Sequence, residues 1–107
     1  IVEERGEAGL IPGRVARALV LAARQALGNA VTHAHGRGLH IIAEGRGEEG
    51  IRVMISDAGP GFDLAAIGPD RLGIRASILA RMAGVAGTAD IESSGSGTTV
   101  SLEWVRP

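Results

Sequence analysis

The stretch from Pro12 to Gly38 constrains the fold most, because it carries two separate stripes of residues at helical spacing. Apolar residues recur every three or four positions, as on the buried face of a helix: Val15, Leu19, Ala22, Ala23, Ala26, Ala30 and Val31. A second stripe is polar and consists of Gln25, Asn29, Thr32 and His33. Proline is tolerated in the first turn of a helix, and glycine commonly ends one. The sequence therefore predicts a long helix that packs on one side and faces something polar on the other.

Segments that alternate between apolar and polar residues follow this helix and predict two hairpins. The first pairs Leu39–Glu44 with Ile51–Ser56, and the second pairs Thr88–Ser93 with Thr98–Trp104. A short strand is also expected at Ile1–Glu4. The stretch from Asp57 to Leu72 is rich in glycine and proline and predicts no regular element. A second helix is then indicated by Ile74, Ile78, Met82 and Val85, with Gly84 and Gly87 closing it.

The order of these elements is strand, helix, hairpin, loop, helix, hairpin, which predicts the α+β class. We expect a two-layer α/β sandwich whose mixed, mostly antiparallel sheet has its helices on one face. The chain has 107 residues with no repeat and no linker, so residues 1–107 are expected to form a single domain. Because the chain opens at Ile1 rather than at a methionine, we expect it to be excised from something longer.

The composition excludes several kinds of chemistry. The chain has no cysteine, which removes disulfides, thiol nucleophiles and the usual structural zinc sites. All 11 basic residues are arginine, so the lysine of Walker-type phosphate loops and Schiff-base chemistry are excluded as well. A net charge of -1 argues against nucleic-acid binding and against a polybasic membrane surface.

The segment Gly45–Gly50 matches the dinucleotide pattern G-x-G-x-x-G by spacing alone. In a dinucleotide site this pattern opens a helix, whereas here the following residues alternate as a strand. Glu48 and Glu49 would also repel a pyrophosphate. The pattern is therefore interpreted as a hairpin turn.

Three histidines could suggest a metal site, but their spacing fits no zinc pattern. His40 alternates out of the apolar row of its strand and is expected to be solvated. His33 lies on the polar stripe with Asn29, and it alone remains a candidate for a functional site.

Four polar or glycine-rich segments then occur in one order along the chain. Taken singly, Asp57–Gly61 and Gly95–Thr99 are typical turns. Together with the polar helix stripe they resemble the ATP-binding domain that gyrase, the ninety-kilodalton chaperone, histidine kinases and MutL share, the Bergerat fold of the GHKL superfamily. Gln25–Ala34 resembles its N box, Asp57–Gly61 its first glycine box, Leu72–Arg75 its second glycine box and Gly97–Val100 its closing glycine-threonine segment. The short loop before Leu72 is most similar to compact bacterial sensor histidine kinases of the nitrate-sensor and desaturase-regulator type.

The resemblance implies a chain that binds ATP with Mg²⁺ and transfers the γ-phosphoryl group to a histidine elsewhere in a parent sensor kinase. Asn29 would ligate Mg²⁺ through its side-chain oxygen, with His33 ordering the phosphate side of the site. Asp57 would accept a hydrogen bond from the adenine amino group. Thr98 or Thr99, entered from Gly97, would support the contact between Asp57 and adenine.

The glycine boxes have implied roles of their own. Gly59 and Gly61 would give the purine room, since glycine lets backbone approach a ring closely. Leu72, Gly73 and Ile74 would begin the second helix, and the free N–H groups at Gly73 would face phosphate. Arg75 could add charge there, although arginines on helices are usually solvated.

One departure from the family bears on the chemistry, because the N box usually begins with glutamate and here begins with Gln25. Glutamine cannot act as a base at neutral pH, so hydrolysis of ATP by water is put in doubt. Transfer to a histidine is less affected, since imidazole is itself a nucleophile. Alternatively, Gln25 is a helix residue without a catalytic part.

The expected partners are ATP, the dimerisation and phosphoacceptor domain of the parent kinase and, indirectly, a response regulator. We expect no nucleic acid, no direct membrane contact and a cytoplasmic location. Two alternatives stay open: an anti-sigma factor of the serine-kinase kind, and a nucleotide-binding module that has lost catalysis.

Overall fold

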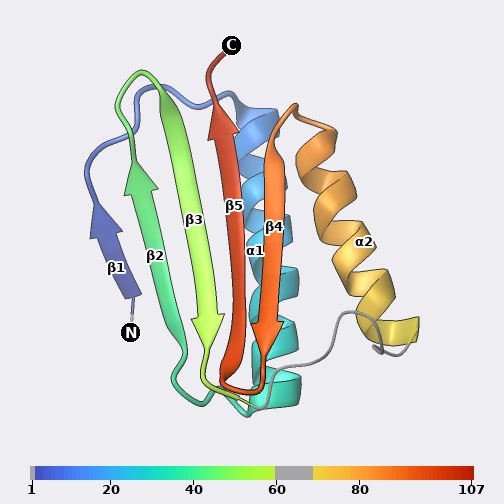
Figure 1. Ribbon diagram of the computed structural model, residues 1–107. Helices are drawn as coiled ribbons and strands as arrows, with labels where there is room; N and C mark the ends of the chain where they lie inside the picture. Colours follow the sequence, from blue (N-terminus) through green and yellow to red (C-terminus); the bar gives the residue numbers. More distant parts are fainter. Residues whose placement is uncertain (1, 60–68) are drawn as a thin grey trace.

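The computed structural model describes residues 2–59 and 69–107, and residues 69–72 only as backbone. It shows two layers; in the view of Figure 1, α1 lies behind the sheet and α2 lies beside β4. In chain order the elements are β1 (Val2–Arg5), α1 (Gly13–Ala34), β2 (His40–Gly45), β3 (Gly50–Asp57), α2 (Pro69–Ala83), β4 (Thr88–Ser94) and β5 (Gly97–Val105).

The five-stranded sheet has the order β1-β2-β3-β5-β4. Its edge strand β1 runs parallel to β2, and the other pairings are antiparallel. Both predicted hairpins are present, β2 with β3 and β4 with β5. The α+β class and the two-layer sandwich with helices on one face are therefore confirmed.

The core lies between the helices and the central strands. α1 packs on β3 and β5, while α2 packs on α1, β4 and β5. The buried residues of α1 recur at helical spacing: Val15, Leu19, Ala22, Ala26, Ala30 and Ala34. The first four of them form one cluster with buried residues of the sheet and of α2: Ile55, Val100, Leu102, Trp104, Ile78 and Met82. Val31, which the sequence assigned to the apolar stripe, is 54% exposed, because the buried row continues from Ala30 to Ala34.

The second helix begins earlier than the sequence indicated. α2 starts at Pro69, so Gly73 is its fifth residue and not its first. Proline is well suited to the first helical position, where its missing N–H would have no intrahelical partner and its φ angle is already helical. The glycine and proline near this point in the sequence suggested an irregular segment, and that interpretation was wrong from Pro69 onward.

α2 ends at the glycines expected to close it, with a left-handed alanine between them: Gly84 directly follows Ala83, and the Gly87 N–H makes one of the closing hydrogen bonds. Ala86 has a φ of 59°. Its N–H donates to the Ala83 carbonyl at 3.1 Å, and the Gly87 N–H donates to the Met82 carbonyl at 2.8 Å. These two bonds form the Schellman arrangement, in which the left-handed position is usually glycine. Gly87 also serves close packing, because a Cβ there would lie 2.9 Å from the Glu103 carbonyl oxygen.

His40 is paired across the β1–β2 edge and is not simply solvated as the alternation suggested. Its Nε2 lies 2.9 Å from Glu3 Oε1, and Arg5 donates to the other carboxylate oxygen of Glu3 at 2.7 Å. The hydrogen bond from Arg5, and after it that of His40, holds the pKa of Glu3 below its ordinary value. This cluster links β1 to β2 through side chains.

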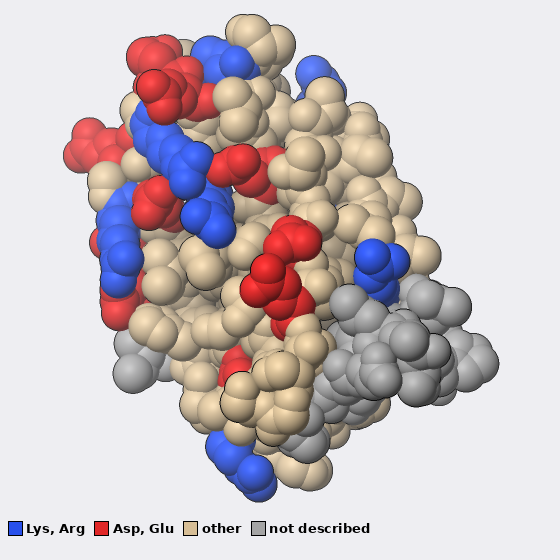
Figure 2. All heavy atoms as spheres, in the orientation of Figure 1, with Lys and Arg blue, Asp and Glu red and all other residues tan. Residues whose placement is uncertain are grey.

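The Gly45–Gly50 segment connects β2 to β3, and a strand follows it, as the hairpin interpretation predicts. Figure 2 shows acidic and basic side chains interleaved on the side of the sheet opposite the helices. There Arg46 donates to Glu44 at 3.0 Å and to Glu103 at 2.6 Å, which ties the turn to β5. The contacts with Glu44 raise the pKa of Arg46 above its ordinary value.

Neither helix, over the residues that the structure describes, is both long and apolar enough to cross a membrane.

The helix end at Ala86 gives a stability prediction. A residue with a Cβ is strained by about 1 kcal/mol in the left-handed region, and glycine is not. Ala86→Gly should therefore raise the free energy of unfolding by about 0.5–1 kcal/mol, part of the gain being offset by a more flexible unfolded chain. Ala80→Gly, at an exposed interior position of the same helix, should lower it by about 1 kcal/mol. Urea unfolding of both variants measures this, and equal losses in the two would contradict the assignment.

Candidate functional site

Asn29 is the polar residue of α1 whose environment most needs an explanation. Its Oδ1 atom is buried and accepts no hydrogen bond within the described part of the chain. Leaving a buried acceptor unpaired costs about 1–3 kcal/mol, and buried polar groups in proteins are nearly always paired. The sequence placed Asn29 on a stripe facing something polar, and the structure places its oxygen in the layer between helix and sheet.

A small cavity of about 20 Å³ lies beside Asn29, enclosed by both helices and the last two strands. Its size is that of about one water molecule. It brings together three residues of the predicted site, Asn29, Ile74 and Thr98, with one arginine and four apolar residues: Arg75, Ala26, Ile78, Ile91 and Val100.

Thr98 and Thr99, which the sequence could not separate, lie in different environments. Thr98 is 7% exposed and lines the small cavity. Its hydroxyl lies 2.8 Å from the Ser93 hydroxyl, and in the sheet register it is the partner of Asp57. Successive residues of a strand point to opposite faces, so Thr99 lies on the other side of β5. The structure thus selects Thr98 as the threonine near Asn29.

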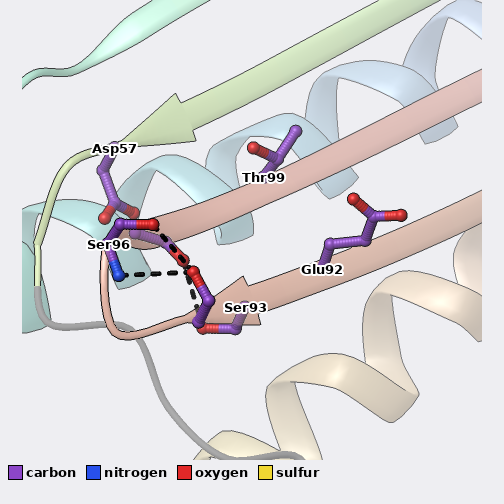
Figure 3. Close-up of a pocket in the computed structure, with 7 residues that line it drawn as sticks. Asp57, Glu92, Ser93, Ser96 and Thr99 are labelled. Carbon is purple, nitrogen blue, oxygen red and sulfur yellow. Dashed lines mark hydrogen bonds between the residues drawn. The ribbon is translucent and has the colours of Figure 1, made fainter.

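Asp57 lies at the end of β3 and borders a larger cleft of about 390 Å³. Its Oδ1 accepts a hydrogen bond from the Gly59 N–H at 2.9 Å, which orients the carboxylate. Figure 3 shows Asp57 beside the turn that carries Ser96. The cleft is lined by Asp57, Glu92, Ser93, Ser94, Ser96, Gly97 and Thr99. The cleft that Asp57 borders and the cavity beside Asn29 have no lining residue in common. Asp57 is linked to the cavity by the sheet register, in which its partner is Thr98.

The glycines of the predicted site serve mainly close backbone packing. Gly59 is buried, and a Cβ there would collide with Ala34 of α1, so its small size seats the end of β3 on the helix. Gly97 has a φ of 145°, and a Cβ there would collide with the Asp57 carbonyl. Gly61 lies outside the described residues, as does the side chain of Leu72.

Gly73 does not stand at the start of α2. The free N–H groups of a helix belong to its first four residues, and Gly73 is the fifth. The expectation that Gly73 itself offers a free N–H to phosphate is therefore wrong, because the free N–H groups belong to the turn that begins at Pro69.

Gln25 is bound to α2 at both ends of its amide. Its Nε2 donates to the Ser77 hydroxyl at 2.9 Å, and its Oε1 accepts from Arg81 Nε at 2.8 Å. This geometry favours a residue that holds the two helices together. Sequence reasoning missed both partners, although Ser77 and Arg81 have the i, i+4 spacing that places two residues on one helix face.

His33 lies in the last turn of α1 and is half-buried. Within residues 2–59 and 69–107, no group of three or more histidine and carboxylate side chains is arranged to hold a metal ion. A magnesium ion in this site would therefore take most of its ligands from phosphate and water.

Arg75, for which the sequence left a solvated position and a place near phosphate open, is half-buried. Its Nε atom is buried and has no hydrogen-bond partner in the described structure. It lines the same small cavity as Asn29. The resemblance to the second glycine box singled out Arg75, but its burial could not be predicted from the sequence because it depends on how α2 packs.

Comparison with known proteins gives structural matches only. No family model matches the chain, and no curated protein does. The histidine kinase domain of the blue-light activated histidine kinase EL346 from Erythrobacter litoralis matches with a TM-score of 0.73 and 23% identity over 95% of this chain. The histidine kinase AdeS from Acinetobacter baumannii matches with a TM-score of 0.73 and 20% identity over 98%.

The chain spans only part of these proteins, 52% of the EL346 kinase domain and of AdeS and 34% of the longer EL346 chain. At this level of identity the likeness concerns the fold. The resemblance found in the sequence is confirmed at that level: the chain has the fold of histidine kinase domains.

Proposed function

We propose that this chain binds ATP with Mg²⁺ and transfers the γ-phosphoryl group to a histidine on a separate phosphoacceptor domain, from which a response regulator is served. The fold of histidine kinase domains supports this function. The observation that carries it is the buried, unpaired Oδ1 of Asn29, with Thr98 and Arg75 beside it. A protein retains such a costly atom where a ligand satisfies it.

The residues present fit a magnesium ion that arrives with phosphates. An amide oxygen is a hard, neutral donor of the kind Mg²⁺ accepts, and Mg²⁺ is commonly held by one or two protein ligands plus substrate phosphates. Asn29 would supply that protein ligand. When bound, the ion neutralises the polyphosphate charge, which suits a chain without lysine.

Asp57 would recognise the purine. Its carboxylate is oriented by the Gly59 N–H and keeps acceptor capacity for an amino group. Thr98, its partner across the β3–β5 pair, holds a hydroxyl next to the same strand end. The cavity beside Asn29 has only about 20 Å³, so entry of a nucleotide between α1 and α2 requires side chains of Ile74 or Arg75 to move.

The two hydrogen bonds of Gln25 favour transfer to a histidine over hydrolysis. Its amide is engaged by Ser77 and Arg81, and glutamine cannot deprotonate water at neutral pH. A histidine acceptor needs less help, since neutral imidazole carries its own nucleophilic lone pair.

The transfer is tested by incubating the longest natural chain that contains these residues with γ-labelled ATP. Label that is lost in acid and retained in alkali is expected, as for phosphohistidine. Acid-stable label on serine of a partner would support the anti-sigma alternative. Tight ATP binding without any labelled residue would support the inactive module.

Replacement of Asp57 by asparagine tests the purine contact. Asp57→Asn keeps the shape and an acceptor for Gly59, but it presents a donor where adenine also presents one. ATP affinity should fall by about 1.5–3 kcal/mol, the range for a hydrogen bond to a charged group. GTP affinity should not fall, because guanine carries an acceptor at that position. Calorimetry with Asp90→Asn as the exposed control measures both, and an unchanged ATP affinity rejects the contact.

Replacement of Asn29 by leucine tests the magnesium ligand. Asn29→Leu keeps the branching and the number of heavy atoms but removes the unpaired oxygen, so the nucleotide-free protein should gain about 1 kcal/mol of stability. Removing Mg²⁺ with EDTA should weaken ATP binding about tenfold or more in the wild type and much less in the variant. Thr32→Val, an exposed change on the same helix, is the control. An equal EDTA effect in wild type and Asn29→Leu would show that Asn29 is not the ligand.

A further inference from the structure

Two buried polar atoms of opposite hydrogen-bonding character belong to residues of one cavity. Asn29 Oδ1 can only accept, and Arg75 Nε can only donate. Neither has a partner in the described structure, so they are not bonded to each other. Both residues line the cavity of about 20 Å³ between α1, α2 and the sheet. These are the only buried side-chain atoms without a partner among the described residues.

Among the residues that the structure describes, none that lines the cavity beside Arg75 carries a negative charge. Apart from Arg75, the lining of the cavity consists of Asn29, Thr98 and apolar residues, with no carboxylate. Of the nearby polar side chains, Gln25 is bound to Ser77 and Arg81, and Thr98 is paired with Ser93. A partly buried guanidinium without an anion is costly, and anionic ligands are what arginine commonly binds in such places.

A ligand that satisfies both residues must present a cation or donor to Asn29 and an anion or acceptor to Arg75. A magnesium–phosphate pair has this character, because the metal accepts the amide oxygen while a phosphate oxygen accepts the guanidinium N–H. We propose that Arg75 is a phosphate-binding residue, which acts with Asn29 on the two halves of one metal–polyphosphate group. This inference rests on the proposed function and adds a residue to it.

In the protein without nucleotide, substitution of Arg75 should not lower the melting temperature. Arg75 Nε has no hydrogen-bond partner in the described structure, so a substitution that removes this atom breaks no described hydrogen bond made by it. Arg75→Met keeps an unbranched apolar stem in the cavity wall. We expect its melting temperature to equal or exceed that of the wild type, while a residue held for stability would lose it on substitution.

Binding of three ligands to the nucleotide-binding chain tests the phosphate contact. The variants are Arg75→Met, Arg75→Lys and Arg24→Met, the last an exposed arginine of α1 that controls for net charge. For Arg75→Met, the affinity for ATP with Mg²⁺ should fall about 10- to 100-fold, as expected for a charge-assisted hydrogen bond. The affinity for ADP should fall by no more than the affinity for ATP does, and the affinity for adenosine should not change. Arg75→Lys, which keeps the charge, should restore part of the ATP affinity, and Arg24→Met should change none of the three.

Several results would overturn the assignment. Equal ATP affinity in Arg75→Met and Arg24→Met removes the phosphate contact. A parallel loss of ATP and adenosine binding, with a lower melting temperature, shows that Arg75 only shapes the cavity. An unchanged ATP affinity with a lower melting temperature points to a water that bridges Arg75 and Asn29. Failure of the wild type to bind ATP at all would instead refute the proposed function, so the two failures are distinguishable.

Discussion

The close approach of α1 to the central strands is the constraint on which the rest of the structure depends. In the C-terminal half of α1 the buried residues are all alanine, at positions 22, 26, 30 and 34. Small side chains let the helix lie near the sheet, and Gly59 continues this contact because a Cβ there would meet Ala34. Asn29 directly precedes the buried Ala30 in α1, and the close packing of the helix on the sheet buries its side-chain oxygen. The small residues that let α1 pack closely on the sheet therefore also determine that the Asn29 oxygen is buried between the two layers.

The two buried polar atoms without a partner, Asn29 Oδ1 and Arg75 Nε, lower the stability of the protein without ligand. The core of α1, α2 and β5 would be more stable if Asn29 and Arg75 were apolar, since neither buried atom is paired in the described structure. By contrast, the polar groups that join the elements are satisfied, as in the bonds of Gln25 to α2 and of Arg46 to β2 and β5. Among the described residues, the buried side-chain atoms without a partner belong to two residues of one cavity, which is characteristic of a binding site that is completed by its ligand.

Much of the fold could be predicted because its signals are periodic. Alternation along β3 and β5 and the helical spacing of α1 depend on local geometry, and they identified the elements and the buried faces. The start of α2 at Pro69, which the sequence analysis placed too late, and the left-handed residue Ala86 at its end were not predicted. Both depend on backbone conformations that the residue types only weakly prefer. In the candidate site, the order of motifs located Asn29, Asp57 and Thr98. It could not reveal that Gln25 is tied to α2 or that Arg75 is buried, because both depend on how two helices pack.

The central claim is that the unpaired oxygen of Asn29 is a metal ligand in an ATP site. A crystal structure of the chain with Mg²⁺ and a non-hydrolysable ATP analogue tests it most directly. The account predicts a magnesium ion at about 2.1 Å from Asn29 Oδ1, bridged to the phosphates, with the adenine amino group donating to Asp57. A nucleotide bound away from both residues, or a metal held without Asn29, would contradict the account.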